Sequence, residues 1–129
     1  MKVGLFGFGR AGRAVATVLL QSKEAYLCWV SENQKFYSID QFEFLGIKHD
    51  EPGIIYSKDE WTPQQLFDKH PVDVIIDFSS AEAVLSYGEE AAKRGIAIVT
   101  AISAYPAETV ALLKNLSRKT RVLWSPNSP

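Results

Sequence analysis

Apolar residues recur along the chain as short continuous runs that alternate with stripes spaced three or four residues apart. The runs, several rich in β-branched residues, predict strands at residues 2–6, 26–30, 54–56, 72–78, 96–100 and 121–124. The stripes predict helices at residues 10–22, 62–70, 79–94 and 106–117. This alternation predicts an α/β fold of the Rossmann type: a doubly wound, mostly parallel sheet of about six strands in a three-layer αβα arrangement.

Two of these helices begin with a capping-box pattern, in which a hydroxyl residue is followed three positions later by Glu or Gln. The segment Thr62-Pro63-Gln64-Gln65 also places a proline at the first helical position. Ser79 with Glu82 predicts the start of the next helix, and Gly95 predicts its end. We therefore expect both helices to begin directly at these hydroxyl residues.

Residues 32–53 form the least regular stretch of the chain. Ser38 with Gln41 matches a further capping box and predicts a short helical turn that stops at Gly46. Whether the aromatic residues of this stretch belong to a core, a lid or a partner surface stays open.

The composition is that of one ordinary globular domain spanning residues 1–129, with 47% hydrophobic and 22% charged residues. A net charge of −1 provides no basic excess for binding nucleic acid. No apolar run approaches the roughly 20 residues of a membrane span, and the N-terminus does not read as a signal peptide. A lone Cys28 fits a reducing compartment. We therefore expect a cytoplasmic protein that binds neither nucleic acid nor a membrane.

The segment Gly7-Phe8-Gly9-Arg10-Ala11-Gly12 matches the pattern G-x-G-x-x-G between the first predicted strand and the first predicted helix. Gly7 would permit the tight turn, Gly9 would let a pyrophosphate approach the main chain, and Gly12 would let the helix pack close to the strand. The helix N-terminus would add free N–H groups and a positive dipole end. In this context the motif predicts a bound dinucleotide.

Glu32 stands 20 positions beyond Gly12, where an acidic residue binds the ribose hydroxyls of the adenosine half. A carboxylate there would repel a 2′-phosphate, and Asn33 follows it where an arginine would favour NADP(H). NAD(H) is therefore predicted as the preferred cofactor over NADP(H). For Arg10 and Arg13, contacts to phosphate and a purely solvated position both stay open.

Further polar residues follow the later strands of the predicted sheet. Asp77 lies at the end of the fourth predicted strand, and Ser79 follows it directly. Residues 100–103 follow the fifth predicted strand, and residues 125–127 follow the sixth. Ligands of open α/β sheets bind outside the carboxyl ends of the strands, so we expect all three segments to line one edge with the glycine loop. Ser79 has two open roles, a cofactor contact and a helix cap. Asp77 is either an acceptor for loop amides or a solvated carboxylate.

No metal or nucleophile is predicted. Cys28 reads as a small buried hydrophobe. His49 and His70 read as surface or helix-end residues, and no group of His, Asp and Glu has metal-ligand spacing.

A family resemblance rests on four segments taken together: Gly9-Arg10-Ala11-Gly12, Asp-Val-Ile-Ile-Asp-Phe-Ser at 73–79, the strand and loop at 96–103, and Ser125-Pro126-Asn127. The chain resembles the N-terminal, nucleotide-binding domain of the 4-hydroxy-tetrahydrodipicolinate reductase (dihydrodipicolinate reductase) family. That family typically shows Gly-Arg-Met-Gly, Asp-Phe-Thr, Gly-Thr-Thr-Gly and Ala-Pro-Asn-Phe-Ser at the corresponding places. The resemblance spans the chain apart from residues 33–70.

The resemblance implies NAD(P)H-dependent hydride transfer to a cyclic imine-like substrate in lysine (diaminopimelate) biosynthesis. It implies a pyrophosphate at residues 9–12, the adenosine ribose at Glu32, and the nicotinamide near Phe78, Ser79, the 100–102 loop and Asn127. With the residues of the glycine loop, the candidate cofactor-binding set is Gly7, Phe8, Gly9, Arg10, Ala11, Gly12, Glu32, Phe78, Ser79, Thr100, Ala101, Ile102 and Asn127.

The chain departs from the family pattern at two places. Thr100-Ala101-Ile102-Ser103 replaces Gly-Thr-Thr-Gly, which keeps main-chain contacts but removes side-chain hydroxyls. The second domain that in the family binds the small-molecule substrate and carries the catalytic His/Lys motif is absent from this chain. We therefore nominate no catalytic residue and expect these 129 residues alone to be inactive. Assembly in the family is largely the work of that missing domain, so a homo-oligomer of the full-length form stays open.

Two other functions remain open at this stage. The chain is alternatively a stand-alone dinucleotide-binding sensor or regulatory module, or the N-terminal domain of another two-domain NAD(P)-dependent dehydrogenase. Fold alone does not choose among these functions.

Overall fold

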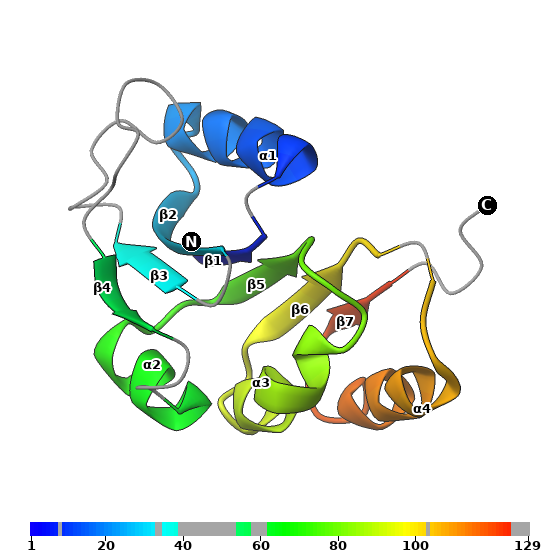
Figure 1. The fold of residues 1–129 in the computed structure, drawn as a ribbon. Coiled ribbons are helices and arrows are strands. Elements are labelled where there is room, and N and C mark those ends of the chain that lie inside the picture. The colour runs from blue at the N-terminus through cyan, green and yellow to red at the C-terminus, as the bar shows by residue number, and fades with distance from the viewer. Residues whose placement is uncertain (8, 33–34, 39–53, 58–61, 103, 125–129) are drawn as a thin grey trace.

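The computed structural model describes residues 1–7, 9–32, 35–38, 54–57, 62–102 and 104–124. These residues form an α/β domain around one seven-stranded sheet (Figure 1). Its strands are β1 (Lys2–Phe6), β2 (Tyr26–Glu32), β3 (Lys35–Ser38), β4 (Ile54–Ser57), β5 (Val74–Asp77), β6 (Ala97–Thr100) and β7 (Val122–Leu123). Its helices are α1 (Arg10–Gln21), α2 (Pro63–Lys69), α3 (Ala83–Lys93) and α4 (Ala107–Leu116). The predicted α/β, Rossmann-type fold is confirmed.

The strand order β4-β3-β2-β1-β5-β6-β7 places β1 at the centre of the sheet. The strands β2, β1, β5, β6 and β7 pair in parallel, so their carboxyl ends meet at one edge. The arrowheads of β5, β6 and β7 point to that edge in Figure 1. From β1 the chain continues to β2 on one side and later to β5 on the other, which makes the gap above β1 and β5 the topological switch point of the sheet.

The strand β3 is absent from the sequence prediction, which expected about six strands. It pairs antiparallel with β2, with Glu32 opposite Lys35, and β4 pairs antiparallel with β3. An antiparallel edge on an otherwise parallel sheet is common in doubly wound folds. Ser38 ends β3, and the rest of the capping box and helical turn predicted there, Gln41 to Gly46, lies outside the described residues.

The helices lie on both faces of the sheet, with α1 on one face and α2, α3 and α4 on the other (Figure 1). Each face has its own buried apolar cluster. The cluster beneath α1 consists of Leu5, Ala16, Leu27 and Val30. The larger cluster on the opposite face includes Trp29, Phe67, Ile75, Val84, Tyr87, Ile98 and Leu113. Two clusters separated by one sheet are the packing expected of three αβα layers.

The capping box predicted at Thr62 is confirmed. The Gln65 main-chain N–H donates to Thr62 Oγ1 at 3.1 Å, and the Thr62 N–H donates to Gln65 Oε1 at 2.9 Å. The helix end predicted at Gly95 is confirmed as well, since its φ is +72°. The Gly95 N–H donates to the main-chain oxygen of Ala92 at 3.0 Å, and the Ile96 N–H donates to that of Ala91 at 2.9 Å.

The capping box predicted at Ser79 is wrong. Helix α3 begins at Ala83, with Glu82 as its N-cap and with no side-chain cap among the described residues. The hydroxyl of Ser79 instead donates to Asp77 Oδ1 at 2.6 Å. Asp77 Oδ1 also accepts from the Ser79 main-chain N–H at 2.8 Å, the donor that a capping box would direct to the Glu82 side chain.

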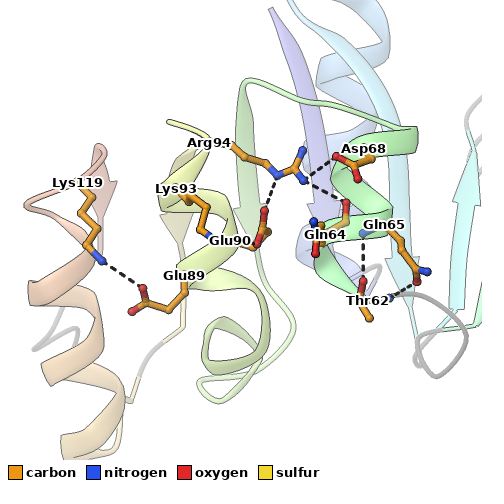
Figure 2. A network of polar contacts seen from close by, with 9 residues as sticks. All are labelled: Thr62, Gln64, Gln65, Asp68, Glu89, Glu90, Lys93, Arg94 and Lys119. Carbon is orange, nitrogen blue, oxygen red and sulfur yellow. Dashed lines mark hydrogen bonds and ion pairs between the residues drawn. The ribbon is translucent and has the colours of Figure 1, made fainter.

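Polar contacts join the three helices on the lower face of Figure 1, and Figure 2 shows them from close by. Arg94 donates to Asp68 Oδ1 at 2.7 Å and to Glu90 Oε2 at 2.8 Å, which connects the ends of α2 and α3. Lys119 contacts Glu89 at 3.3 Å and extends the contacts to the end of α4. The side chains of Arg94 and Glu90 are partly exposed and those of Asp68, Glu89 and Lys119 are more than half exposed, so each pair should stabilise the fold only modestly.

Candidate functional site

The turn after β1 passes so close to the turn after β5 that only glycine fits there. Gly7 has a φ of +93°, in the region that L side chains rarely adopt. A Cβ on Gly7 would lie 2.8 Å from the main-chain carbon of Phe78 and 2.9 Å from the main-chain nitrogen of Ser79. Gly7 therefore lets the two turns lie in direct contact.

Gly12 and Gly9 differ in what surrounds them. Gly12 is buried in α1, and a Cβ there would collide with the main-chain oxygen of Gly7. The helix can therefore approach the strand end only because this position is glycine, as the motif predicts. Gly9 is exposed, and a Cβ on it would have no atom within 4 Å. Packing within the described protein therefore does not require glycine at position 9.

Helix α1 begins directly behind Gly9. Gly9 provides no side-chain cap, and the first turn contains no acidic residue within the described part of the chain. The main-chain N–H groups at this end are therefore not occupied by a local carboxylate, and the positive end of the helix dipole points to the same place. Arg10 and Ala11 are exposed beside it.

The main chain brings Glu32 next to the glycine turn. Phe6 of β1 pairs with Ser31 of β2, and the Gly7 N–H donates to the Ser31 oxygen at 2.8 Å. Glu32 is the next residue and the last of β2. Its main chain thus lies where the motif requires an acidic residue, while the position of its carboxylate lies outside what the structure describes.

Asp77 organises the turn that contacts Gly7. It is the last residue of β5 and is fully buried. Its Oδ1 accepts from the Ser79 main-chain N–H at 2.8 Å and from the Ser79 hydroxyl at 2.6 Å. Its Oδ2 accepts from the Tyr87 hydroxyl at 2.7 Å. Of the two roles left open for Asp77, the structure shows the acceptor for loop groups.

Burial favours the uncharged form of both groups in the Asp77–Tyr87 contact. It raises the pKa of Asp77 above its ordinary value, although the hydrogen bonds from Ser79 and Tyr87 lower it in part. Burial, followed by the nearby charge of Asp77, raises the pKa of Tyr87 well above its ordinary value. Tyr87 therefore stays protonated and serves as a donor to the carboxylate.

The loop after β6 is held by Tyr105. The Tyr105 hydroxyl donates to the Thr100 main-chain oxygen at 3.2 Å and accepts from the Ile102 N–H at 3.2 Å. The Ala101 N–H donates to the Asp77 main-chain oxygen at 2.9 Å, which continues the β5–β6 ladder into this loop. Thr100 is buried, Ala101 is exposed and Ile102 is half-buried. The loop therefore presents main chain and a small side chain at the carboxyl edge.

The structure brings most of the candidate residues to one edge of the sheet. The glycine turn, the main chain of Glu32, the Phe78–Ser79 turn and residues 100–102 follow four adjacent parallel strands. Phe8 and Asn127 lie outside the described residues. Sequence reasoning missed Tyr87 and Tyr105, because each lies on or beside a helix at spacings typical of core packing.

The residues that the structure describes hold neither a metal site nor a membrane-spanning helix. No group of three or more His, Cys, Asp or Glu side chains is placed to hold a metal ion among them. In the same part of the chain, none of the helices is both long and apolar enough to cross a bilayer.

This geometry defines a class. A doubly wound sheet with a glycine turn and a helix N-terminus at its switch point is the architecture of Rossmann-type nucleotide-binding domains. Comparison with known sequences narrows the class to a family. The family model described as "Dihydrodipicolinate reductase, N-terminus" matches residues 1–128, and the chain belongs to this family. The sequence prediction of the family is confirmed.

Individual relatives agree with this family. The 4-hydroxy-tetrahydrodipicolinate reductase of Nitratidesulfovibrio vulgaris (strain DP4) is 30% identical over 119 residues, which are 92% of this chain and 41% of that protein. The enzyme of the same name from Lawsonia intracellularis is 32% identical over 65 residues, which are 50% of this chain and 25% of that protein. The chain thus spans less than half the length of the curated relatives it matches.

Solved structures support the fold. A hyperthermophilic archaeal homoserine dehydrogenase in complex with NADPH superposes with a TM-score of 0.63 at 17% identity, covering 95% of this chain and 43% of that one. A putative homoserine dehydrogenase from Archaeoglobus fulgidus gives a TM-score of 0.63 at 21% identity, covering 96% of this chain and 42% of that one. At these identities the likeness concerns the fold alone.

Proposed function

We propose that this chain is the dinucleotide-binding domain of an NAD(P)H-dependent reductase that acts on a cyclic imine-like substrate in lysine (diaminopimelate) biosynthesis. The observation that carries this proposal is the open space at Gly9. Gly7 and Gly12 are required by contacts within the protein, whereas the packing does not require Gly9. A glycine without a packing reason, at an uncapped helix N-terminus and at the switch point, fits a pyrophosphate that approaches the main chain. The family membership supports the reductase activity.

The two halves of the dinucleotide would bind on the two sides of β1. Residues 7–12 would hold the pyrophosphate with main-chain N–H groups of α1, and Glu32 at the end of β2 would accept hydrogen bonds from the adenosine ribose. The nicotinamide half would lie over β5 and β6, beside Phe78, Ser79 and the 100–102 loop. Asn127 would complete this half. The half-buried ring of Phe78, packed on the apolar cluster beneath α1, would form part of the floor.

The chemistry of the reaction would come from the cofactor, which supplies a hydride from the nicotinamide ring when bound. The residues of this chain orient that ring and hold the phosphates. Binding of the small-molecule substrate and protonation of the product would require residues from a second domain of the protein. We therefore expect no reductase turnover from these 129 residues alone, and a measurable rate of NADH oxidation by them would contradict this division of labour.

The cofactor preference proposed here is NAD(H) over NADP(H). Glu32 stands at the ribose position, and a carboxylate there repels a 2′-phosphate. We propose to titrate the 129-residue chain with NADH and with NADPH by calorimetry, at matched and low ionic strength. NADH should bind more tightly, and Glu32→Ala should reduce or reverse that preference while thermal unfolding stays at the wild-type temperature. Tighter binding of NADPH by the wild-type chain would overturn the preference, and no binding of either nucleotide would overturn the proposed function.

A further inference from the structure

The carboxylate of Asp77 links the turn that contacts Gly7 to a helix on the opposite face of the sheet. Two of its three hydrogen bonds come from Ser79, at the turn, and the third comes from Tyr87, in the middle of α3. The Tyr87 ring is itself buried and stacks on Phe6, with ring centroids 4.7 Å apart and 12° between the ring planes. Asp77 thus holds the turn at a fixed distance from a side chain that is packed beneath the end of β1.

Main-chain contacts connect the turn after Asp77 to the turn after β1 and to the loop after β6. The Phe78 N–H donates to the Phe6 oxygen at 2.8 Å, and the Ala101 N–H donates to the Asp77 oxygen at 2.9 Å. Gly7 lies against the main chain of Phe78 and Ser79 closely enough that a Cβ would not fit. A shift of the Asp77 side chain would therefore move the main chain of Phe78 and Ser79, which lies against Gly7 where the two halves of the proposed site meet.

Folding stability alone does not explain why the Asp77 side chain is buried, because burying a carboxylate costs free energy. A fully buried carboxylate loses its hydration, and the raised pKa of Asp77 reports that loss. An exposed residue can shape a turn by the same local hydrogen bonds without that loss. What burial adds to these local hydrogen bonds is one further contact, in which the Tyr87 hydroxyl donates to the Asp77 carboxylate and fixes its orientation.

We propose that Asp77 is a positioning residue for the nicotinamide half of the dinucleotide, because its carboxylate, oriented by Tyr87, sets the main chain of Phe78 and Ser79. This inference rests on the proposed function. It predicts that Asp77 affects binding of the whole dinucleotide more than binding of ADP, which would occupy only the adenosine and pyrophosphate part on the other side of β1. A role in folding alone would change both affinities by the same factor or leave both unchanged.

Three substitutions separate these roles. Asp77→Ala removes the acceptor and leaves the donors of Ser79 and Tyr87 without it. Asp77→Asn keeps an oxygen for Ser79 and places an amide donor toward the Tyr87 hydroxyl, which can also accept. Tyr87→Phe keeps the ring on Phe6 and removes only the hydroxyl, so it tests the proposal even if Asp77→Ala does not fold.

A matched control lies at the opposite edge of the sheet. Thr120 Oγ1 donates to the Ile96 main-chain oxygen at 3.0 Å, in a part-buried position before β6 begins. Thr120→Val removes a hydrogen bond of similar burial without touching the carboxyl edge. It should lower the unfolding temperature and leave the affinities for NADH and for ADP at their wild-type values.

The experiment is a calorimetric titration of each variant of the 129-residue chain with NADH and with ADP. We expect Asp77→Ala to weaken NADH binding about tenfold and ADP binding no more than about twofold, since all three hydrogen bonds to the carboxylate are lost, two of them from the turn. Tyr87→Phe should weaken NADH binding about threefold with ADP unchanged, and Asp77→Asn should restore most of the NADH affinity. If the wild-type chain binds NADH and these variants keep its ratio of NADH to ADP affinity, the positioning role is wrong while the proposed function stands. If the wild-type chain binds ADP but not NADH, both are wrong.

Discussion

Replacing Gly9 by alanine should weaken NADH binding at least tenfold without harming the fold. The φ of Gly9 is −77°, in the extended region open to any residue, and the added Cβ would meet no atom within 4 Å. Alanine is a poorer N-cap than glycine, which costs a fraction of a kcal/mol up to about 1 kcal/mol. Alanine also lowers the entropy of the unfolded chain, which stabilises the fold by about 0.4–1 kcal/mol. These two effects offset each other, so the free energy of unfolding should change by less than about 0.5 kcal/mol.

The effect on binding should be much larger than the effect on folding. A methyl group at Gly9 would occupy the space through which a pyrophosphate approaches the main chain. We expect NADH affinity to fall at least tenfold, which corresponds to about 1.4 kcal/mol of binding free energy. Gly12→Ala is the contrasting variant, because its Cβ would collide with the Gly7 oxygen and should destabilise the fold by about 1–3 kcal/mol.

Urea unfolding and calorimetric titration of the same samples would measure both quantities. The decisive result is Gly9→Ala protein with wild-type unfolding and lost NADH binding. A Gly9→Ala chain that unfolds like the wild type and still binds NADH with wild-type affinity would refute the reasoning, since the open space would then serve no ligand.

Four further predictions concern stability and the order of the site. Thr62→Ala removes the capping box and should lower the free energy of unfolding by about 1 kcal/mol in urea titrations. Arg94→Met removes the ion pair to Asp68 of α2 and the pair to Glu90 of α3, and since both are partly exposed it should cost no more than about 1 kcal/mol. A loss that did not shrink in high salt would speak against an electrostatic origin. The pKa of Asp77 is raised in the folded state, so the stability that its side chain contributes is fully present below the unfolded-state pKa and is lost as pH rises through the folded-state pKa. The unfolding free energy of the wild type minus that of Asp77→Asn should therefore fall over that pH window, and a rise would show that the pKa is shifted in the opposite direction. Tyr105→Phe should speed amide hydrogen exchange at residue 102, and unchanged exchange there would show that the hydroxyl does not order the loop.

Local patterns predicted the elements because the relevant physics is local. The order of strands and helices, the capping box at Thr62 and the stop at Gly95 depend on residues within one or two turns of each other. The same holds for the spacing of the glycine motif, whereas Glu32 was found from its fixed separation of 20 positions in the βαβ pattern. The strand β3 was missed because its short, mixed segment becomes a strand only by pairing with β2 and β4.

Ser79 shows where local reasoning stops. Its pattern with Glu82 is a valid capping box, yet its hydroxyl and N–H both donate to Asp77, and the helix starts four residues later. The same carboxylate accepts from Tyr87 of α3, a contact that the pattern of Ser79 and Glu82 does not reveal. The sequence by itself thus determined the fold class and the glycine turn, which follow from periodicity and spacing, and it indicated the family through the resemblance of its motifs. Only the tertiary structure decided that a buried carboxylate joins α3 to the turn against Gly7, because that contact exists only when segments distant in sequence pack together.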